Sequence, residues 1–325
     1  MPRRVPRSAS KYPLEDELNE RLASLKNRIL AATPSLCLER ARVWTRIHKE
    51  HAQLPIARRR ALALRTTLAE MTIRIDDGEL IVGNQSGALR AASIFPEYAV
   101  DWILKEIDGI DHRPAESYLI GEADKAELKE ICRWWKGQTL QDRSHALLGP
   151  ELSEIHETGI VRAEGNMTSG DGHIAIHHRK LLEIGLGGYA RLVAEADAAT
   201  DVSTWDGLRK HQLYLAMADS LAGFSAFIRR FEALALSKAD ALASAGAPSA
   251  ATAAGDVRRR AELLEIARTC GAIAEAPPTN FREALQLTYF SQLVLQIESN
   301  GHSLSLGRMD QYLYPFYKSD MERGR

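Results

Sequence analysis

Cysteine is scarce in this 325-residue sequence, which contains only Cys37, Cys132 and Cys270. The three lie far apart and form no CxxC pair, so the sequence predicts neither a disulfide framework nor a zinc knuckle. Such sparse use of cysteine is typical of the reducing cytoplasm, and we therefore expect a cytoplasmic protein. Long apolar runs are missing too. None approaches the roughly 20 residues of a membrane-spanning helix, so no membrane association is expected.

An excess of charge of one sign is also absent. The formal net charge is −1, which provides no overall field to attract nucleic acid or an anionic membrane. Basic residues are concentrated only within residues 1–12, a stretch that lacks the apolar segment of a secretory signal. We expect a disordered basic tail there and one folded region over 13–325. Its 45% hydrophobic and 26% charged residues are typical of a globular protein.

Helical periodicity dominates what is present. Apolar residues recur at helical spacing from Leu14 to Ile29, and an acidic early turn with a basic later turn suits the helix dipole. Further helices are predicted over 36–51, 56–71, 96–107, 124–136, 178–198, 203–245 and 254–274. Gly137 is expected just beyond the end of one of them. The low-complexity stretch 237–260 is expected to join two long helices, because alanine favours helix on both sides of it.

Two further segments have patterns of their own. Residues 71–84, MTIRIDDGELIVGN, alternate apolar and polar side chains on both sides of an Asp-Asp-Gly turn at 76–78. This pattern predicts a β-hairpin, because glycine tolerates the positive φ that such turns need. The later segment FREALQLTYFSQLVLQI is apolar almost all round, which predicts a central helix with Asn280 or Thr279 as its N-cap.

Histidines cluster in the stretch GDGHIAIHHRK. His173 and His177 are four residues apart, which is the spacing of two zinc ligands on one helix face. However, Ile174 replaces the glutamate of HExxH, the two glycines favour a loop or a strand, and no third ligand stands at a recognised spacing. A zinc hydrolase is therefore only an alternative. The ordinary interpretation, a solvated or hydrogen-bonded histidine, fits His177 and His178 better than His173.

A compact polar cluster follows the apolar helix in the stretch ESNGHSLSLGRMD, which includes Glu298, Asn300, His302 and Ser303. Neighbouring residues usually point apart, and no GxSxG motif is present, so His302 and Ser303 do not indicate a serine hydrolase. Buried polar groups must be hydrogen-bonded. Two interpretations therefore stay open: a pocket for a polar small molecule, or an internal network that closes the loop.

Four ordered stretches resemble the N-terminal part of glycyl radical enzymes of the pyruvate formate-lyase-like group, which includes glycerol and diol dehydratases and choline and isethionate lyases. They are DGELIVGNQSGALRAASIFPEYAVDWILKEID, RWWKGQTL, GDGHIAIHHRKLLEIGLGGY and ALQLTYFSQLVLQIESNGHSLSLGRMDQYLYPFYKSD. The resemblance implies an α/β fold with predominant helix. It would be the N-terminal portion of a ten-stranded barrel built from two parallel five-stranded halves and incomplete in this chain.

The same resemblance implies a lyase chemistry of anaerobic metabolism. A radical stored on a glycine backbone passes to a cysteine at the barrel centre, and the thiyl takes a hydrogen atom from a small-molecule substrate. A separate iron–sulfur, S-adenosylmethionine-dependent activase installs the radical, and no bound cofactor or metal is implied here. By motif, His173 resembles a substrate-side histidine, and His302 and Ser303 resemble the pair that hydrogen-bonds the substrate. Asn166 is a less specific match. The family is often homodimeric.

Two elements of the family have no match. The catalytic cysteine lies in Gly-Cys-x-Glu, whereas Cys37 lacks the glycine and Cys132 and Cys270 lack the glutamate. The stretch GLGGYARL contains Gly-Tyr but not the preceding Arg-Val of the radical glycine motif. We therefore expect a truncated fragment that is inactive alone, with a C-terminal half on a separate chain. Unpaired strand edges and an exposed helix at 281–297 are expected to follow. The alternative is a non-catalytic helical binding or assembly protein that reuses the scaffold.

Overall fold

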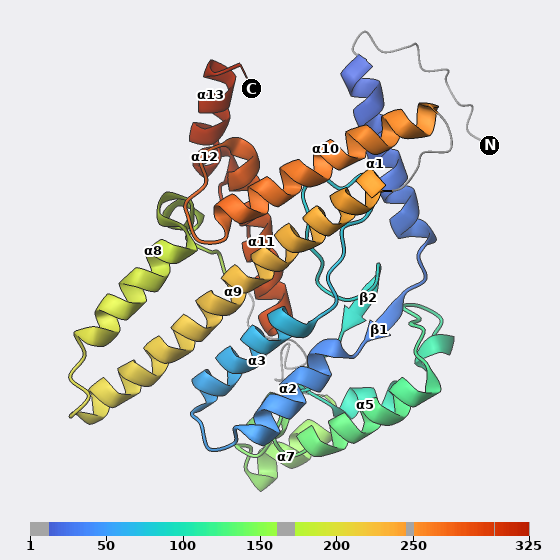
Figure 1. Cartoon of the computed structure of the whole chain (residues 1–325). Coiled ribbons are helices and arrows are strands. Elements are labelled where there is room, and N and C mark those ends of the chain that lie inside the picture. Colours follow the sequence, from blue (N-terminus) through green and yellow to red (C-terminus); the bar gives the residue numbers. More distant parts are fainter. Residues whose placement is uncertain (1–12, 161–172, 245–249, 302, 325) are drawn as a thin grey trace.

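Helices dominate the computed structural model, in agreement with the prediction (Figure 1). It describes residues 13–160, 173–244, 250–301 and 303–324. The elements are α1 (Pro13–Ala31), β1 (Ser35–Cys37), α2 (Glu39–Glu50), α3 (Ile56–Glu70), β2 (Ala91–Ser93), α4 (Asp101–Glu106), the 3-10 helix η1 (Ile110–His112), α5 (Glu122–Trp135), α6 (Leu140–His145), α7 (Pro150–Glu157), α8 (His178–Ala198), α9 (Trp205–Ser244), α10 (Ala250–Ile273), α11 (Phe281–Ser299), α12 (Met309–Tyr312) and α13 (Tyr314–Glu322). The predicted basic tail lies outside the described residues. Of the helices that are described, none has the length and apolar character that a membrane crossing requires.

A small parallel sheet interrupts the helices. β1 and β2 pair in register, and on the other side of β1 a parallel bridge joins Ser35 to Leu119. The backbone N–H of Leu36 donates to the carbonyl of Leu119 (3.0 Å). The helix predicted over 36–51 therefore begins only at Glu39. The prediction is wrong for its first three residues, because strand pairing with distant segments overrides the local helical pattern.

The main core lies where α3, α9, α10 and α11 pack together (Figure 1). Phe227, Phe231 and Phe290 are fully buried there, and their ring centroids lie 5.1 to 5.9 Å apart. Asn280 caps α11, since its side chain accepts the backbone N–H of Glu283 (3.0 Å). The predicted central helix is thus confirmed. The expectation that 281–297 would be exposed is wrong, because helices of this same chain, α10 among them, pack on it.

The predicted β-hairpin over 71–84 is wrong, although its turn is present. The backbone N–H of Glu79 donates to the carbonyl of Asp76 (3.2 Å), but the flanking segments form no strands. Instead, the side-chain amide of Gln286 accepts from the N–H of Val82 (2.9 Å) and donates to its carbonyl (2.8 Å). A side chain of α11 thus provides the hydrogen bonds that a neighbouring strand would have supplied.

Helix α4 is shorter than predicted. It begins at Asp101, whereas Pro96 lies in the preceding turn. Glu97 in this turn is only 8% exposed and pairs with the guanidinium of Arg40 (2.6 Å). This buried ion pair holds Glu97 in the turn, and the helix starts later than the proline indicates. The other predicted helices are confirmed within a few residues, and Gly137, at φ +83°, follows α5 as expected.

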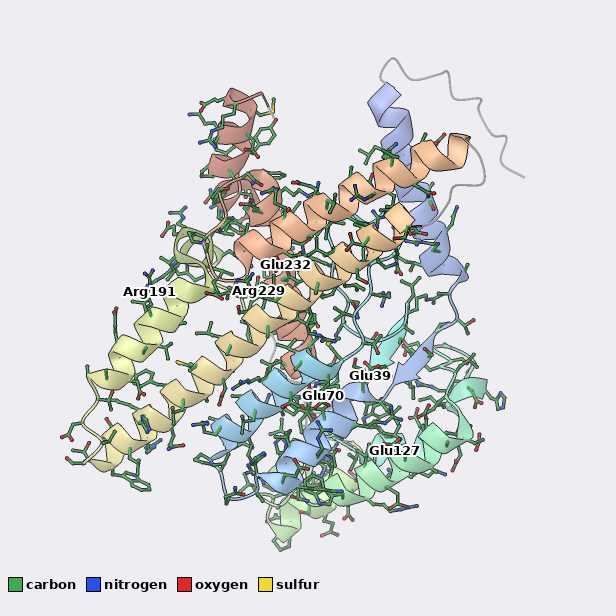
Figure 2. All side chains as sticks on the ribbon, viewed as in Figure 1. Glu39, Glu70, Glu127, Arg191, Arg229 and Glu232 are labelled. Carbon is green, nitrogen blue, oxygen red and sulfur yellow. The ribbon has the colours of Figure 1, made fainter. Side chains whose placement is uncertain are left out.

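Ion pairs on the surface link α2 to its neighbours. Arg46 binds Glu70 of α3 (2.6 Å) and Arg42 binds Glu127 of α5 (2.7 Å), and Figure 2 labels both carboxylates. Exposed pairs of this kind contribute less than about 1 kcal/mol each. The position of α2 therefore depends mainly on its buried side chains, of which Trp44 is fully inaccessible.

Candidate functional site

Two loops that are distant in sequence lie side by side. We call residues 173–177 the histidine loop, and residues 300–306, of which 302 lies outside the described residues, the serine loop. A parallel bridge joins Ala175 to Ser305, and the N–H of Ser305 donates to the carbonyl of Ile174 (2.9 Å). His173 and Ser303 each precede a bridge residue by two positions, so both lie at the same end of the paired segment. The structure thus brings together the two predicted site residues that it describes.

Both residues have an unusual backbone conformation. His173 has φ 59° and Ser303 has φ 58°, in the left-handed region that residues other than glycine adopt rarely. Both residues are exposed. Backbone strain of this kind concentrates at functional sites, which makes the paired loops the candidate site. His302 and Asn166 lie outside the described residues, so their roles stay predictions.

A buried histidine directly follows the histidine loop, at the start of α8. His178 is 2% exposed and stacks on the ring of Tyr312 at 4.9 Å. Burial lowers the pKa of His178, which favours the neutral ring, and neither ring nitrogen has a hydrogen-bond partner among the described residues. The interpretation of His178 as a solvated histidine is therefore wrong. No signal in the sequence revealed the pair, because it depends on the packing of α12 against α8.

Tyr312 also contacts the serine loop directly. Its hydroxyl donates to the carbonyl of Leu306 (2.8 Å), and burial raises the pKa of Tyr312 to about 12. A second bond runs from the side chain of Gln292 in α11 to the carbonyl of Leu304 (3.1 Å). The loop backbone after Ser303 is therefore anchored to helices on two sides.

His177 has a local structural role. Its Nδ1 accepts the backbone N–H of Lys180 (3.2 Å) and so caps α8, which agrees with its ordinary interpretation. Within the part of the chain that the structure describes, no group of three or more His, Cys, Asp or Glu side chains is arranged to hold a metal ion. The described residues thus offer His173 and His177 no third ligand for the zinc alternative.

Two of the three thiols are fully buried. Burial raises the pKa of Cys132 and of Cys270 to about 12, so both stay protonated and are poor nucleophiles. Cys37 is half-buried in β1. Glu39, two residues later, accepts the N–H (2.9 Å) and the hydroxyl (2.6 Å) of Thr72. Within the Cys-x-Glu sequence at 37–39, Glu39 therefore joins the start of α2 to the segment that follows α3.

The Gly-Tyr sequence of GLGGYARL lies within the kinked helix α8. Gly185 has φ +67° and interrupts the helical conformation. A Cβ atom there would lie 2.5 Å from the carbonyl oxygen of Glu275, and that oxygen accepts the N–H of Gly187 (2.8 Å). These glycines allow close contact between α8 and the connection from α10 to α11.

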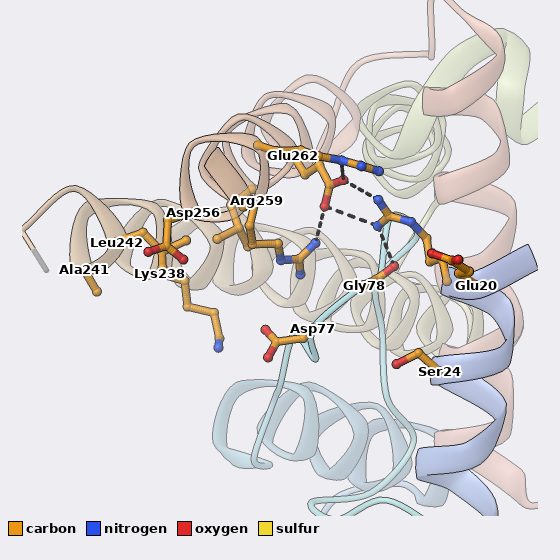
Figure 3. Close-up of a pocket in the computed structure, with 14 residues that line it drawn as sticks. Glu20, Ser24, Asp77, Gly78, Lys238, Ala241, Leu242, Asp256, Arg259 and Glu262 are labelled. Atoms are coloured by element: carbon orange, nitrogen blue, oxygen red, sulfur yellow. Dashed lines mark hydrogen bonds and ion pairs between the residues drawn. The ribbon is translucent and has the colours of Figure 1, made fainter. Parts of the chain in front are cut away.

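A separate cavity of about 770 Å³ is lined by α1, α9, α10 and the turn near Gly78 (Figure 3). Glu262 on its wall accepts from Arg259 (2.9 Å) and from Arg21. Burial opposes ionisation of Glu262, but the two arginines outweigh it and hold its pKa at about 2. The arginines also donate to the carbonyls of Gly78 (3.0 Å) and Asp76 (2.9 Å). Because these charges hold the turn in place and none of the residues that line the cavity belongs to the paired loops, we interpret them as structural.

Comparison with known proteins gives consistent matches. Residues 15–325 match the family model described as pyruvate formate lyase-like. Probable dehydratase YbiW of Escherichia coli K12 is 46% identical over 308 residues, which are 94% of this chain and 36% of that protein. The glycerol-bound B12-independent glycerol dehydratase from Clostridium butyricum has a TM-score of 0.84 at 31% identity. The match covers 92% of this chain and 36% of the dehydratase chain. A glycyl radical enzyme from Archaeoglobus fulgidus has a TM-score of 0.81 at 30% identity, over 92% of this chain and 37% of its own.

The fold is thus that of the N-terminal part of a glycyl radical enzyme barrel. The chain belongs to the pyruvate formate lyase-like family. It spans about 36% of the length of the curated relatives that it matches. The resemblance and the fold class inferred from the sequence are confirmed.

Proposed function

We propose that this chain forms the N-terminal third of a glycyl radical dehydratase or lyase that acts on a small polar substrate. The paired histidine and serine loops would form one wall of the substrate pocket. The observation that carries this proposal is their bridge at Ala175 and Ser305, in a fold shared with a glycerol-bound dehydratase. The curated relative reported above, which is 46% identical, is also described as a probable dehydratase.

The side chains in these loops suit a substrate with hydroxyl groups. The hydroxyl of Ser303 can donate one hydrogen bond and accept others, and the imidazole of His173 has two ring nitrogens that can form hydrogen bonds. In this proposal His302 and Asn166 add further polar contacts to the substrate. The substrate is thereby held and oriented, while the hydrogen atom is removed by a group that the rest of the enzyme provides.

The catalytic cysteine and the radical glycine would come from a C-terminal portion, carried by a separate chain or by further sequence. The absence of Gly-Cys-x-Glu from the sequence supports this division, as does the complete burial of the Cys132 and Cys270 side chains. A radical activase that uses S-adenosylmethionine would act on that portion. The 325-residue chain alone would then be inactive. The same proposal places the complete enzyme in the cytoplasm and in anaerobic metabolism. It would form a homodimer, as members of the family often do.

Electron paramagnetic resonance tests this division of labour. The chain alone, treated anaerobically with activase and S-adenosylmethionine, should give no glycyl doublet. The same chain, joined to the C-terminal portion of the Clostridium butyricum glycerol dehydratase, should give the doublet and dehydrate glycerol or a related diol. A doublet from the isolated chain would contradict the proposal.

Substitutions in the joined enzyme test the substrate wall. Ser303→Ala and His173→Ala should each lower kcat/KM by about tenfold or more, since each removes a polar contact with the substrate. The doublet should be retained in both variants. The matched control is His112→Ala, because the His112 side chain is 85% exposed on η1. Wild-type kcat/KM in Ser303→Ala and His173→Ala would rule out the proposed wall.

A helical binding or assembly protein is the second candidate. Large apolar side chains exposed around the start of α9 favour it, among them Val202 (54%), Trp205 (76%) and Leu208 (41%). Exposed apolar side chains that lie close together mark interaction surfaces. If the joined protein gives neither doublet nor product, while the isolated chain is a stable and monodisperse species, this second function is favoured.

A further inference from the structure

Arg40, the second residue of α2, reaches the C-terminal end of α11. Its Nε donates to the carbonyl of Ile297 and its Nη2 donates to the carbonyl of Glu298, both at 2.6 Å. The same guanidinium binds the carboxylate of Glu97 through two bonds of 2.6 and 3.1 Å. Arg40 is 3% exposed and Glu97 is 8% exposed. The buried ion pair of Arg40 and Glu97 thus contacts the C-terminal end of α11, the helix that precedes the serine loop.

Two aromatic rings fix the plane of this guanidinium. Its Cζ lies 3.8 Å from the ring centroid of Trp44 and 3.8 Å from that of Phe95. Because the group is planar and its donors point in fixed directions, the two rings and the Glu97 carboxylate together determine where its remaining donors point. These donors point at the two carbonyls of α11. A lysine at this position could not reproduce both the stacking and the paired bonds.

A second ion pair holds the same helix end from α3. Arg60 binds the carboxylate of Glu298 and donates to the hydroxyl of Tyr98 (3.1 Å). The side chains of Arg60 and Glu298 are 30% and 27% exposed. Tyr98 and Glu97 come from the same turn before α4. Contacts from α2 and α3 therefore converge on two consecutive residues of α11, and the turn before α4 binds both of the arginines that make them.

The helix end in turn sets the start of the serine loop. The last carbonyls of a helix have no partner within it and carry the negative end of its dipole, so a cation with free N–H donors satisfies them. Two residues beyond Glu298, Asn300 takes the left-handed conformation (φ 45°) that ends α11. Ser303 follows three residues later. The end of α11 therefore determines where the serine loop leaves the core.

We propose that Arg40, Glu97, Arg60 and Glu298, here named the α11 clamp, are positioning residues for the serine loop. They lie outside the paired loops and act by fixing the last turn of α11. The inference deepens the proposed function and rests on it for one point, namely that the serine loop faces a substrate. The contacts that define the clamp do not depend on that point.

Hydrogen–deuterium exchange of the full chain, without substrate or radical, tests the clamp. In Arg40→Met, amides of the serine loop should exchange about tenfold faster, because two helix-end carbonyls lose their partner. Amides of α9 in the main core should keep their wild-type rates. Arg40→Lys should restore part of the protection, since it keeps a cation but loses the stacked, paired geometry. The matched control is Arg46→Met, on the exposed side of the same helix.

Glu298→Gln provides a second test, because its side chain is partly exposed and its loss should not prevent folding. It should speed exchange in the serine loop by a smaller factor than Arg40→Met and leave α9 unchanged. Wild-type exchange of the loop in both variants would overturn the inference, and so would an equal rise in α9 and in the loop. If Arg40→Met does not fold, the result for Glu298→Gln decides alone. Failure of the proposed function would show separately, as the absence of a doublet or product in the joined enzyme.

Discussion

The aromatic core and the paired loops differ in burial and in backbone conformation, yet α11 contributes to both. It supplies Phe290 to the core and hydrogen-bonds the serine loop through Gln292. In the core, Phe227, Phe231 and Phe290 are fully buried and contact one another through their rings. In the loops, His173 and Ser303 are exposed and have positive φ angles. The side chains that pack the aromatic core are therefore not the ones that the paired loops expose. Changes in one region should therefore leave the other largely unaffected, apart from effects that α11 transmits.

Phe231→Ala should have the largest effect. It leaves a cavity where Phe227 and Phe290 now pack against the ring, and such a change costs about 3–5 kcal/mol. Urea unfolding monitored by circular dichroism measures the loss of the free energy of unfolding. Tyr314→Ala is the control, because Tyr314 is 57% exposed. A loss below about 1 kcal/mol in Phe231→Ala would mean that the core is not the main source of stability.

Glu262→Gln should have a smaller effect, which depends on pH. The pKa of Glu262 is held at about 2 in the folded protein, below its ordinary value of 4.5. The ionised carboxylate therefore stabilises the fold above pH 4.5, and this contribution is lost as the pH falls from 4.5 to 2. The variant should be less stable at pH 7 and should lose less stability over that acid range.

Acid titration of the thermal midpoint measures this difference. Glu50→Gln, at the exposed end of α2, should keep the wild-type pH dependence. An unchanged acid dependence in Glu262→Gln would mean that the arginines around Glu262 add no net stability. Because no residue of the paired loops lines this cavity, neither variant should change exchange in the serine loop.

Ser303→Gly should have the smallest effect on stability, and its sign should be opposite. Glycine removes the cost of a left-handed backbone but adds entropy to the unfolded chain, so we expect a gain of less than about 1 kcal/mol. In the joined enzyme the same change should lower kcat/KM, because the hydroxyl is lost. Ser319→Gly in α13 should instead destabilise, since glycine is unfavourable inside a helix. A clear loss of stability in Ser303→Gly would show that Ser303 also has a structural role.

Most of the helices followed directly from the sequence. The periodicity of apolar residues predicted α1, α3, α5, α8, α9 and α10, and the apolar stretch with its Asn280 cap predicted α11. These signals are local, because a helix satisfies its own backbone hydrogen bonds and shows its buried face in the spacing of its side chains. The motif of the serine loop was also recognisable, since it directly follows this strongly apolar helix.

The errors occurred where distant residues provide the partners. Alternation in 71–84 predicted a hairpin, but the polar side chain of Gln286 bonds to this segment in place of a strand. The start of α2 and the start of α4 shifted because β1 pairs with β2 and because Glu97 pairs with Arg40. Nothing within a short window of sequence shows such a partner. The stacking of His178 on Tyr312 was missed for the same reason.

The sequence by itself determined the family, the helical character of the chain and the residue types in both loops. The tertiary structure decided that the histidine loop and the serine loop meet, and that Arg40 holds the end of the helix from which one of them departs. The physical reason is the range of the interactions. Helical periodicity involves neighbours within a few positions, whereas Arg40 and Ile297 are 257 residues apart, and only the packed core fixes their separation in space.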